Sequence, residues 1–396
     1  MSRRVVITGI GMVTPLGGTV EETWRHVCAG RSGVGPVTRF DASSLPVTFA
    51  AEAAPVEAHP LDQGDLKLRL AATALAEALS QSGPIGGPRT GVCMGSEIGR
   101  PSSETLAHAL RDGVPPSRSA LERMDPAAPT RLMAVMAGAE GPQSTVSTAC
   151  TSSSQAVGEG VLRIRRGEAD AMIVGGVDVL VDAIMITGFA KLGALSERNE
   201  DPAAASRPFD SDRDGFVLGE GAGVLIAEER SRAIERGAPI LGEITGYGCS
   251  CNAYRITDSP PDGRGAHQSM RAALQDAGLR PDQIGYINAH GTSTPMNDPS
   301  EARGIQRTFP ASVPVSSTKS SMGHLVAACG AVEAILCLLA IRDQRLPPTI
   351  NLDRPDPACE LNHVANVARA APVEHAMTNA FGFGGSNGSL VVSKHG

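Results

Sequence analysis

One cysteine of the chain has the neighbours expected of a nucleophile. Cys150 lies in the stretch Ser144 to Gly160, where small and hydroxylated residues leave room for a ligand to approach. The run Thr145 to Thr148 has the composition of a buried strand, and apolar residues at helical spacing follow until Gly167. Cys150 is therefore predicted at a strand-to-helix junction, where unpaired amide N–H groups and the helix dipole favour thiolate over thiol. The alternative interpretation is a small buried core cysteine.

Two histidines and a lysine follow predicted strands in the C-terminal part of the chain. His290 lies in the loop Asn288 to Thr294, and Lys319 precedes His324 by five residues. His324 is expected to begin a helix over 325 to 341, where the helix dipole disfavours imidazolium and keeps the ring neutral. A neutral imidazole can donate a hydrogen bond to a developing oxyanion. Each residue alone could be structural or a solvated charge, but their shared placement favours a catalytic role.

A glycine-rich segment near the C-terminus could supply backbone N–H groups to the same chemistry. Asn379 to Gly388 contains four glycines, with Phe383 among them. Such a segment brings its backbone close to a ligand and can form half of an oxyanion hole. A strand entry in which the glycines serve only packing explains the same residues equally well.

The elements that must position these residues repeat along the chain. Three short segments of the first half recur in the same order in the second half. Residues 7–11 are similar to 244–248, and residues 146–148 are similar to 315–317. The third match pairs Gly219, Gly223 and Leu225 with Gly384, Gly388 and Leu390. Together they predict two fused halves, residues 1–240 with Cys150 and residues 241–396 with the histidines, Lys319 and the Phe383 loop. Alternating strands and helices predict an α/β fold with a largely buried, mixed sheet in each half.

Composition and charge exclude several classes of protein. The 396 residues suffice for a large core, which must be built from aliphatic residues because aromatics make up only 3% of the chain. A net charge of −7 argues against nucleic acid as a partner, and no apolar run reaches membrane-spanning length. The eight cysteines show no metal-ligand spacing, which indicates reduced thiols in a cytoplasmic protein. Gly9 and Gly11 lack the third glycine and the acidic partner of a dinucleotide-binding motif.

Four motifs together resemble those of a known family. TACTSS around Cys150, NAHGTST around His290, STKSSMGH with Lys319 and His324, and FGFGGSNG around Phe383 are similar to elongating β-ketoacyl-acyl-carrier-protein synthases. These are ketosynthases of type II fatty-acid and polyketide systems, and the resemblance runs from residue 3 to about 393. It implies a thiolase-like fold, in which two similar halves with mixed sheets form five layers, α/β/α/β/α.

The resemblance also implies a reaction and the residues that perform it. Cys150 would take an acyl group from acyl carrier protein, and the backbone N–H groups of Cys150 and Phe383 would hold the oxyanion. His290 and His324 would then stabilise the enolate formed when a malonyl unit on carrier protein loses carbon dioxide, giving a longer 3-oxoacyl chain. Lys319 would support His324 and the local charge balance. The implied reaction requires neither a metal nor an organic cofactor.

The resemblance further suggests contacts with the substrate and the carrier protein. The expected substrate-binding residues are Phe383 as a gate, Phe189 in the pocket wall, Thr292, Thr294 and Gly384. Because the carrier protein of the family is acidic, docking requires a local basic patch, for which the candidates are Lys67, Arg69, Arg131, Lys191 and Arg213. Residues 97–130 are atypical of the fatty-acid enzymes and should shape the end of the pocket and a dimer interface.

Pathway and assembly stay open between two alternatives. Ala139–Pro142 and Cys251–Tyr254 resemble polyketide ketosynthases, which favours the ketosynthase subunit of a type II polyketide system, paired with a paralogue that lacks the nucleophile. The alternative is a housekeeping fatty-acid elongation synthase acting as a homodimer. In either case strand 144–148 should pair across a two-fold axis, with the interface near residues 97–150. A cysteine hydrolase, a thiolase and a non-catalytic chain-length partner are less consistent with the motifs.

Overall fold

The computed structural model describes residues 3–97, 103–115 and 117–396. Within these ranges, eleven strands form one hydrogen-bonded sheet in the order β12-β10-β9-β14-β15-β8-β1-β7-β6-β4-β5. The strands of the first half are β1 (Val5–Val13), β4 (Thr90–Gly95), β5 (Gln143–Val146), β6 (Ala171–Asp178) and β7 (Gly221–Glu229). Those of the second half are β8 (Gly242–Cys251), β9 (Tyr286–Asn288), β10 (Pro314–Ser316), β12 (Asn362–His363), β14 (His375–Phe381) and β15 (Ser386–Ser393).

The two halves of this sheet have the same strand order. Outwards from the centre the first half runs β1-β7-β6-β4-β5, and the second half runs β8-β15-β14-β9-β10, with the short β12 added in parallel at its outer edge. Each half is mixed: its two central pairings are antiparallel and its two outer pairings are parallel. Between the two halves of the sheet, the described strands pair through Val6 and Ile7 with Glu243 and Gly242. The segments that repeat in the sequence lie on or beside equivalent strands, namely β1 and β8, β5 and β10, and β7 and β15.

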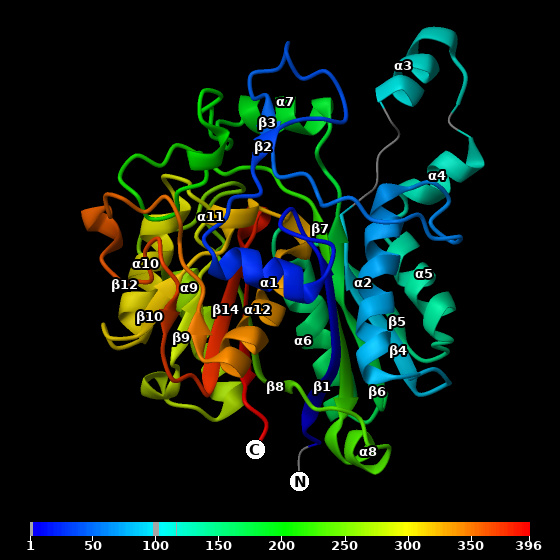
Figure 1. Cartoon of the computed structure of the whole chain (residues 1–396), viewed down its shortest axis with the longest axis vertical. Helices are drawn as coiled ribbons and strands as arrows, with labels where there is room; N and C mark the ends of the chain where they lie inside the picture. The colour runs from blue at the N-terminus through cyan, green and yellow to red at the C-terminus, as the bar shows by residue number, and fades with distance from the viewer. Residues whose placement is uncertain (1–2, 98–102, 116) are drawn as a thin grey trace.

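Helices cover both halves and also fill the space between them (Figure 1). The central layer consists of α6 (Ser152–Arg165) and α12 (Cys329–Asp343), which pack on each other and on strands of both halves. On the outer face of the first half lie α2 (Leu66–Ser82) and α5 (Ala128–Ala137), and on that of the second half lie α9 (Arg264–Ala277) and α10 (Asn297–Thr308). The α/β/α/β/α layering expected from the resemblance is confirmed.

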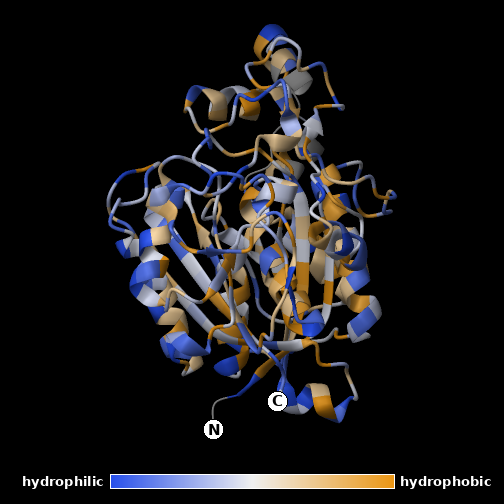
Figure 2. Cartoon of the chain, turned by 60° about the vertical axis from the view of Figure 1, so that its left-hand side comes forward, coloured by the Kyte–Doolittle hydropathy of each residue, from blue (hydrophilic) through white to orange (hydrophobic). Residues whose placement is uncertain are grey.

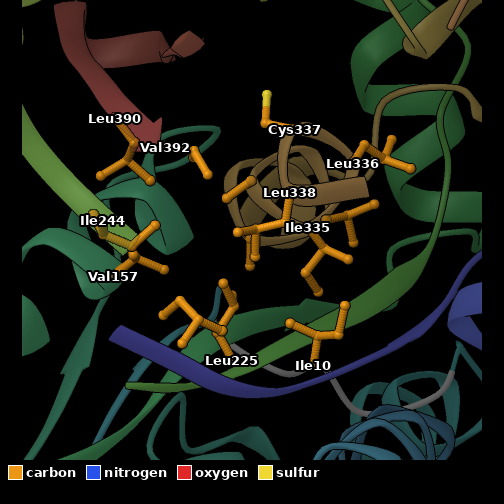
Figure 3. Packing of buried hydrophobic residues seen from close by; sticks show 14 of the residues in the cluster. Ile10, Val157, Leu225, Ile244, Ile335, Leu336, Cys337, Leu338, Leu390 and Val392 are labelled. Carbon is orange, nitrogen blue, oxygen red and sulfur yellow. The ribbon is translucent and has the colours of Figure 1, made fainter. Parts of the chain in front are cut away.

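The central layer explains why α12 has no polar face. Its residues from Cys329 to Ile341 are all buried, as expected of a helix surrounded by core on every side. Figure 3 looks along this helix; the labelled side chains around it are Ile10, Val157, Leu225, Ile244, Leu390 and Val392. Figure 2 shows the same trend across the whole chain, with apolar positions gathered on the inner strands and on the inward faces of the helices.

Glycines allow α6 and α12 to approach closely. A Cβ added at Gly330 of α12 would lie 1.9 Å from Ser154 Oγ of α6, and one added at Gly158 of α6 would lie 2.4 Å from the Tyr247 ring. Both distances are far shorter than van der Waals contact, so glycine is required at Gly330, where α12 crosses α6, and at Gly158, where α6 packs on Tyr247 of β8. This close contact matters for the site, because α6 and α12 follow Cys150 and His324 respectively.

The remaining elements are short and lie mostly around the ends of the sheet. The helices are α1 (Val20–Cys28), α3 (Ser103–Asp112), α4 (Arg118–Met124), α7 (Ala183–Lys191), α8 (Arg230–Glu235) and α11 (Lys319–Met322). Two small sheets are formed by β2 (Gly35–Pro36) with β3 (Phe49–Ala50) and by β11 (Arg345–Leu346) with β13 (Arg369–Ala370). Residues 98–102 and 116 of the atypical 97–130 stretch lie outside the described residues, and α3 and α4 form most of its remainder. No helix in the described part of the chain combines the length and the apolarity needed to cross a membrane.

Two expected elements differ from those in the structure. The strand before Cys150 is not buried: β5 ends at Val146 and is partly exposed, because it is an edge strand and β4 is its one partner among the described strands. The helix expected from 325 begins only at Cys329, after a 3-10 turn over Val326–Ala328. Val326 has a φ of +47°, which an α-helix cannot contain.

Candidate active site

Cys150 lies at the junction between a strand and a helix, as predicted. It is 8% exposed and follows Ala149, whose φ of +51° turns the chain sharply before α6. The Thr148 N–H donates to Ser152 Oγ at 2.9 Å, and Ser152 Oγ–H donates to the Ala149 carbonyl at 2.6 Å. The turn that presents the sulfur is therefore held by the first residue of the helix itself.

His324 contacts the cysteine sulfur directly. Its Nε2 lies 3.0 Å from Cys150 Sγ, although the two residues are 174 positions apart in the chain. Its Nδ1 accepts the backbone N–H of Val326 at 3.2 Å and lies 3.0 Å from Cys329 Sγ. Because Nδ1 acts as an acceptor, the neutral ring carries its proton on Nε2. The N–H of His324 therefore points into the space beside the sulfur.

His290 completes a group of three side chains with Cys150 and His324. The two imidazole rings meet edge to face, with centroids 5.3 Å apart, and one ligand atom from each of the three residues lies within 4.8 Å of the others. The backbone N–H groups of His290 and Gly291 donate to the Glu301 carboxylate at 2.8 and 2.7 Å, which fixes the loop. Within the described part of the chain, His290 Nδ1 has no hydrogen-bond partner.

Cysteine and histidine are common zinc ligands, but the shortest contact in this group has the length of a hydrogen bond. In a tetrahedral zinc site, a thiolate sulfur and an imidazole nitrogen lie roughly 3.5 Å apart. The 3.0 Å between Cys150 Sγ and His324 Nε2 is shorter than this. The geometry is that of an N–H donor facing sulfur.

Lys319 supplies a buried positive charge behind the histidines. Its side chain is 2% exposed and forms an ion pair with Glu333 of α12. Burial lowers the pKa of Lys319, but the charge and hydrogen bond of Glu333, together with Cys329 and Glu301, outweigh this and leave the pKa raised, so the ammonium stays charged. Burial and the Lys319 charge hold the pKa of both His290 and His324 well below the usual imidazole range. The rings are therefore neutral as expected, although the main causes are burial and Lys319 rather than a helix dipole at His324.

The expectation of a thiolate at Cys150 is wrong for this closed site. Burial raises the pKa of the Cys150 thiol to about 12, and the charge of Lys319 and hydrogen bonds from the backbone N–H groups of Phe383 and Cys150 offset this only in part. The physical reason is desolvation, which penalises the charged form of a buried sulfur. The backbone N–H groups of Phe383 and Cys150 are the pair expected to form an oxyanion hole, and both point towards the Cys150 sulfur.

The backbone of the glycine-rich loop comes very close to the nucleophile. A Cβ at Gly382 would lie 3.1 Å from the Thr148 carbonyl oxygen and 3.3 Å from the Cys150 nitrogen. Gly384 and Gly385 then take φ values of +82° and +80°. Glycine thus allows both the approach and the turn that place the Phe383 N–H beside the sulfur.

The three residues open into a cavity of about 330 Å³. One side is apolar, with Leu180, Met185, Phe189, Phe216 and Val326. The other is polar, with Thr257, Asp258, Ser259, Thr292, Thr294 and Asn297. Three phenylalanine rings lie close together in the cavity wall. The ring centroid of Phe189 lies 5.4 Å from that of Phe216 and 6.5 Å from that of Phe383.

The expected substrate-binding residues mostly line this cavity. Phe189, Thr292, Thr294 and Phe383 do so, but Gly384 does not. Its N–H donates instead to the Ile256 carbonyl at 2.6 Å, which ties the glycine loop to the neighbouring loop.

Two of the basic residues expected to dock a carrier protein are buried. Lys67 forms an ion pair with Asp178 at 3.5 Å, and Arg213 pairs with Asp356 at 2.7 Å with its side chain only 6% exposed. Both are wrong as docking residues, because their charges are used inside the protein. Arg69 is half-buried against Asp62, whereas Arg131 and Lys191 are exposed.

Sequence reasoning missed several residues that surround the nucleophile. Glu97 lines the cavity and accepts the Ala149 N–H, Cys329 contacts His324, and Phe216 packs against the same ring with centroids 5.3 Å apart. Cys329 could have been noticed as a cysteine five residues after His324 in a short polar-to-apolar transition. No local signal marks Glu97 or Phe216, because their proximity to Cys150 arises from tertiary structure.

This fold and site define a class of enzyme, and the chain belongs to the β-ketoacyl synthase family. The family models for the N-terminal and C-terminal domains of β-ketoacyl synthase match residues 2–233 and 241–353. Members of this class are condensing acyltransferases, and this chain is a β-ketoacyl-acyl-carrier-protein synthase. The chain is similar to 3-oxoacyl-[acyl-carrier-protein] synthase 2 of Coxiella burnetii, at 43% identity over 99% of both chains. It is 42% identical to the protein of the same name from Synechocystis, over 99% of this chain and 98% of the other.

The similar solved structures are also ketosynthases, and they include ketosynthases solved with an acyl-carrier protein or a chain length factor. A ketosynthase of a type II polyketide system, solved with its acyl-carrier protein and bound to the hexaketide, matches at 33% identity with a TM-score of 0.93. The ishigamide ketosynthase/chain length factor matches at 34% identity, also with a TM-score of 0.93. A β-ketoacyl synthase from Burkholderia phymatum matches at 35% identity with a TM-score of 0.91. All three matches cover 100% of both chains.

Proposed function

We propose that this enzyme elongates acyl chains on acyl carrier protein in fatty-acid synthesis, with Cys150 as nucleophile and His290 and His324 as hydrogen-bond donors. The observation that carries the proposal is the 3.0 Å contact between His324 Nε2 and Cys150 Sγ, beside His290, in a cavity with one apolar side. A thiol alone would suit many reactions. Two neutral imidazoles beside it suit stabilisation of an enolate.

The first half-reaction transfers the acyl group to Cys150. The sulfur attacks the thioester carbonyl, the carrier thiol leaves, and the thiol proton passes to that leaving group. The backbone N–H groups of Cys150 and Phe383 hold the tetrahedral oxyanion, each such donor contributing about 3 kcal/mol. Because burial keeps the resting Cys150 thiol protonated, the thiol loses its proton only when the thioester has approached.

The second half-reaction makes the carbon–carbon bond. The malonyl thioester carbonyl lies against the N–H groups of His290 and His324, and its C2–carboxylate bond breaks to release carbon dioxide. The resulting enolate oxygen is held by hydrogen bonds from the two rings, each of which, when neutral, donates through its one N–H. C2 then attacks the acyl-cysteine, and the Cys150 sulfur leaves and takes a proton. The product is a 3-oxoacyl thioester on carrier protein, and Lys319 keeps both rings neutral throughout.

Two further proposals concern the organisation and the setting of the enzyme. We propose a first half of residues 1–240 carrying the nucleophile and a second half of 241–396 carrying the histidines; the equal strand orders and the two family-model matches support this division. All eight cysteines are unpaired thiols, which supports a reducing, cytoplasmic environment.

A type II polyketide system is the second candidate setting. The similarity in fold to ketosynthases solved with a carrier protein or a chain length factor favours it. The higher identity to synthases of the 3-oxoacyl-[acyl-carrier-protein] synthase 2 type favours fatty-acid elongation. Our sequence-based preference for the polyketide setting is thus less well supported than its alternative.

The reaction is tested with purified carrier protein. Incubation with acyl- and malonyl-carrier protein should place an acyl mass on Cys150 and yield 3-oxoacyl-carrier protein, both followed by mass spectrometry. Cys150→Ala should keep the fold, checked by circular dichroism, and acquire no acyl mass. An acyl mass on the Cys150→Ala variant would identify another nucleophile and contradict the proposal.

We also propose that the enzyme works as a dimer through the free edge of β5. That edge has no partner strand within the described part of the chain, and α4 and α5 beside it expose Leu121 and Val135, at 52% and 70%. Arg131 and Lys191 are the candidates for docking the carrier protein.

Purification of the chain alone tests the kind of dimer. A homodimer with full elongation activity would support the fatty-acid setting. Inactivity that is rescued by a co-expressed paralogue without the nucleophile would support the polyketide setting. An active monomer would contradict both.

A further inference from the structure

Glu97 places a carboxylate in the cavity on the side of the nucleophile. It follows the end of β4 by two residues, and its backbone carbonyl accepts the buried Lys67 ammonium. Its side chain lines the cavity together with Cys150 and Ala149. Neither half-reaction described above uses this group.

The carboxylate is held in place by the turn that carries Cys150. Its Oε1 accepts the Ala149 N–H at 2.9 Å and lies 3.2 Å from Ser152 Oγ, and its Oε2 accepts the Ser147 hydroxyl at 3.1 Å. Ala149 is the residue with the left-handed backbone directly before the nucleophile. A charge bound at this position cannot move away when a substrate enters.

Among the described residues, no cationic side chain lines the cavity beside the Glu97 carboxylate. Of the described residues that line the cavity, none is Lys or Arg, and the other carboxylate, Asp258, is paired with Arg255 at 3.1 Å. Lys319 lies behind the histidines, in an ion pair with Glu333. The described cavity lining therefore contains one carboxylate without a cationic partner, and it lies beside Ala149. Glu97 also contributes to the raised pKa of Cys150, as expected of a negative charge close to the sulfur.

We propose that Glu97 is a specificity-determining residue that excludes anionic groups from Cys150. A neutral acyl chain enters the apolar side at no electrostatic cost, whereas a chain that ends in a carboxylate meets a fixed like charge. The consequence for catalysis rests on the proposed function, in which Cys150 must be acylated by a neutral chain and not by malonyl. Glu97 would thus disfavour acylation of Cys150 by the anionic extender.

The exclusion can be tested without assuming the proposed reaction. Iodoacetamide and iodoacetate both alkylate the Cys150 thiolate with loss of iodide, and they differ by one negative charge. Their rate ratio at one sulfur is independent of the fraction of thiolate, which is the same for both reagents. Mass spectrometry of peptides gives the ratio at Cys150 and at the exposed Cys249 of the same chain.

The expected result is a rate ratio of iodoacetamide to iodoacetate that is about tenfold higher at Cys150 than at Cys249. Glu97→Gln keeps an oxygen that can accept the Ala149 N–H and removes the charge, so its ratio at Cys150 should fall about tenfold. Asp258→Asn is the matched control, a carboxylate of the same cavity that is already paired, and it should leave the ratio nearly unchanged. An unchanged ratio in Glu97→Gln would overturn the proposal. If that variant does not fold, equal ratios at Cys150 and Cys249 in the unmodified enzyme would overturn it as well.

The functional consequence is measured with succinyl- and butyryl-carrier protein, which differ in a terminal carboxylate and carry no group that is lost by decarboxylation. Butyryl loading of Cys150 should exceed succinyl loading in the unmodified enzyme, and Glu97→Gln should reduce this preference. Equal loading by both donors in the unmodified enzyme would contradict the proposal. If neither donor loads Cys150, the proposed function fails, while the alkylation ratio still decides the role of Glu97.

Discussion

Replacing Lys319 by Met tests whether one buried charge keeps both catalytic histidines neutral. Lys319 lies behind His290 and His324 and is the charged group that lowers the pKa of both rings, second only to burial. Methionine has a similar length and no charge. The substitution therefore removes the electrostatic contribution while leaving most of the packing in place.

The cost in stability follows from the partner of Lys319. The side chains of Lys319 and Glu333 are each 2% exposed, so removal of one leaves an unpaired buried carboxylate or ammonium. Breaking such a pair costs about 3–5 kcal/mol, out of a total free energy of unfolding of about 5–15 kcal/mol. Lys319→Met should thus fold but unfold at lower urea concentration. The double variant Lys319→Met/Glu333→Gln should regain part of this loss, because no charge is left unpaired.

The catalytic effect appears in the pH dependence of decarboxylation. Protonation turns His324 Nδ1 from an acceptor into a donor and breaks its hydrogen bond from the Val326 N–H, so activity is expected above the pKa of the rings and is lost as the pH falls through it. In the unmodified enzyme both pKa values lie well below 6.5, so carbon dioxide release should persist as the pH falls through that value. In the double variant the pKa of both rings rises, and release should decline at a higher pH.

The assay measures carbon dioxide release from malonyl-carrier protein against pH for the unmodified enzyme and the double variant. Lys67→Met is the matched control, because Lys67 is a second buried lysine in an ion pair and its charge is not among the causes that lower the pKa of either histidine. It should lower the free energy of unfolding without moving the acidic limb. Superimposable acidic limbs for the double variant and the unmodified enzyme would refute the role given to the Lys319 charge.

Two further outcomes follow from the same geometry. His290→Ala and His324→Ala should still acquire an acyl group on Cys150, since backbone N–H groups serve that step, but each should release carbon dioxide about 100-fold more slowly. Undiminished release from either variant would remove that histidine from the mechanism. Gly330→Ala should lower the free energy of unfolding by about 1–3 kcal/mol in urea titrations, because its Cβ would overlap Ser154 Oγ at 1.9 Å. Equal stability would mean that α6 and α12 separate more easily than their packing indicates.

The sequence by itself determined the features that depend on local pattern. The change from a β-branched run to helical spacing placed Cys150 at a turn, and the turn is there. The short repeated segments predicted equivalent strands, and these strands occupy equivalent places in the two halves of the sheet. Such features can be inferred because strand periodicity, helix periodicity and glycine spacing are properties of neighbouring residues.

Local pattern was insufficient where exposure or hydrogen bonding depends on distant residues. The strand before Cys150 was predicted as buried from its composition, but its place at the sheet edge leaves it partly exposed. Lys67 and Arg213 were candidates for a basic surface, yet Asp178 and Asp356, 111 and 143 residues away in the chain, pair with them inside the protein.

Tertiary structure alone decided the chemistry of the site. The 3.0 Å contact of His324 with Cys150 spans 174 residues of sequence, and the Val326 N–H that fixes its tautomer depends on a backbone turn that the sequence did not predict. The protonated thiol and the neutral histidines are consequences of burial, which is a property of the whole fold. Glu97 reaches the nucleophile only because the loop after β4 lies against the turn after β5. Residue types thus identified the reacting groups, whereas their distances, desolvation and charge neighbours arise from the packing of the two halves.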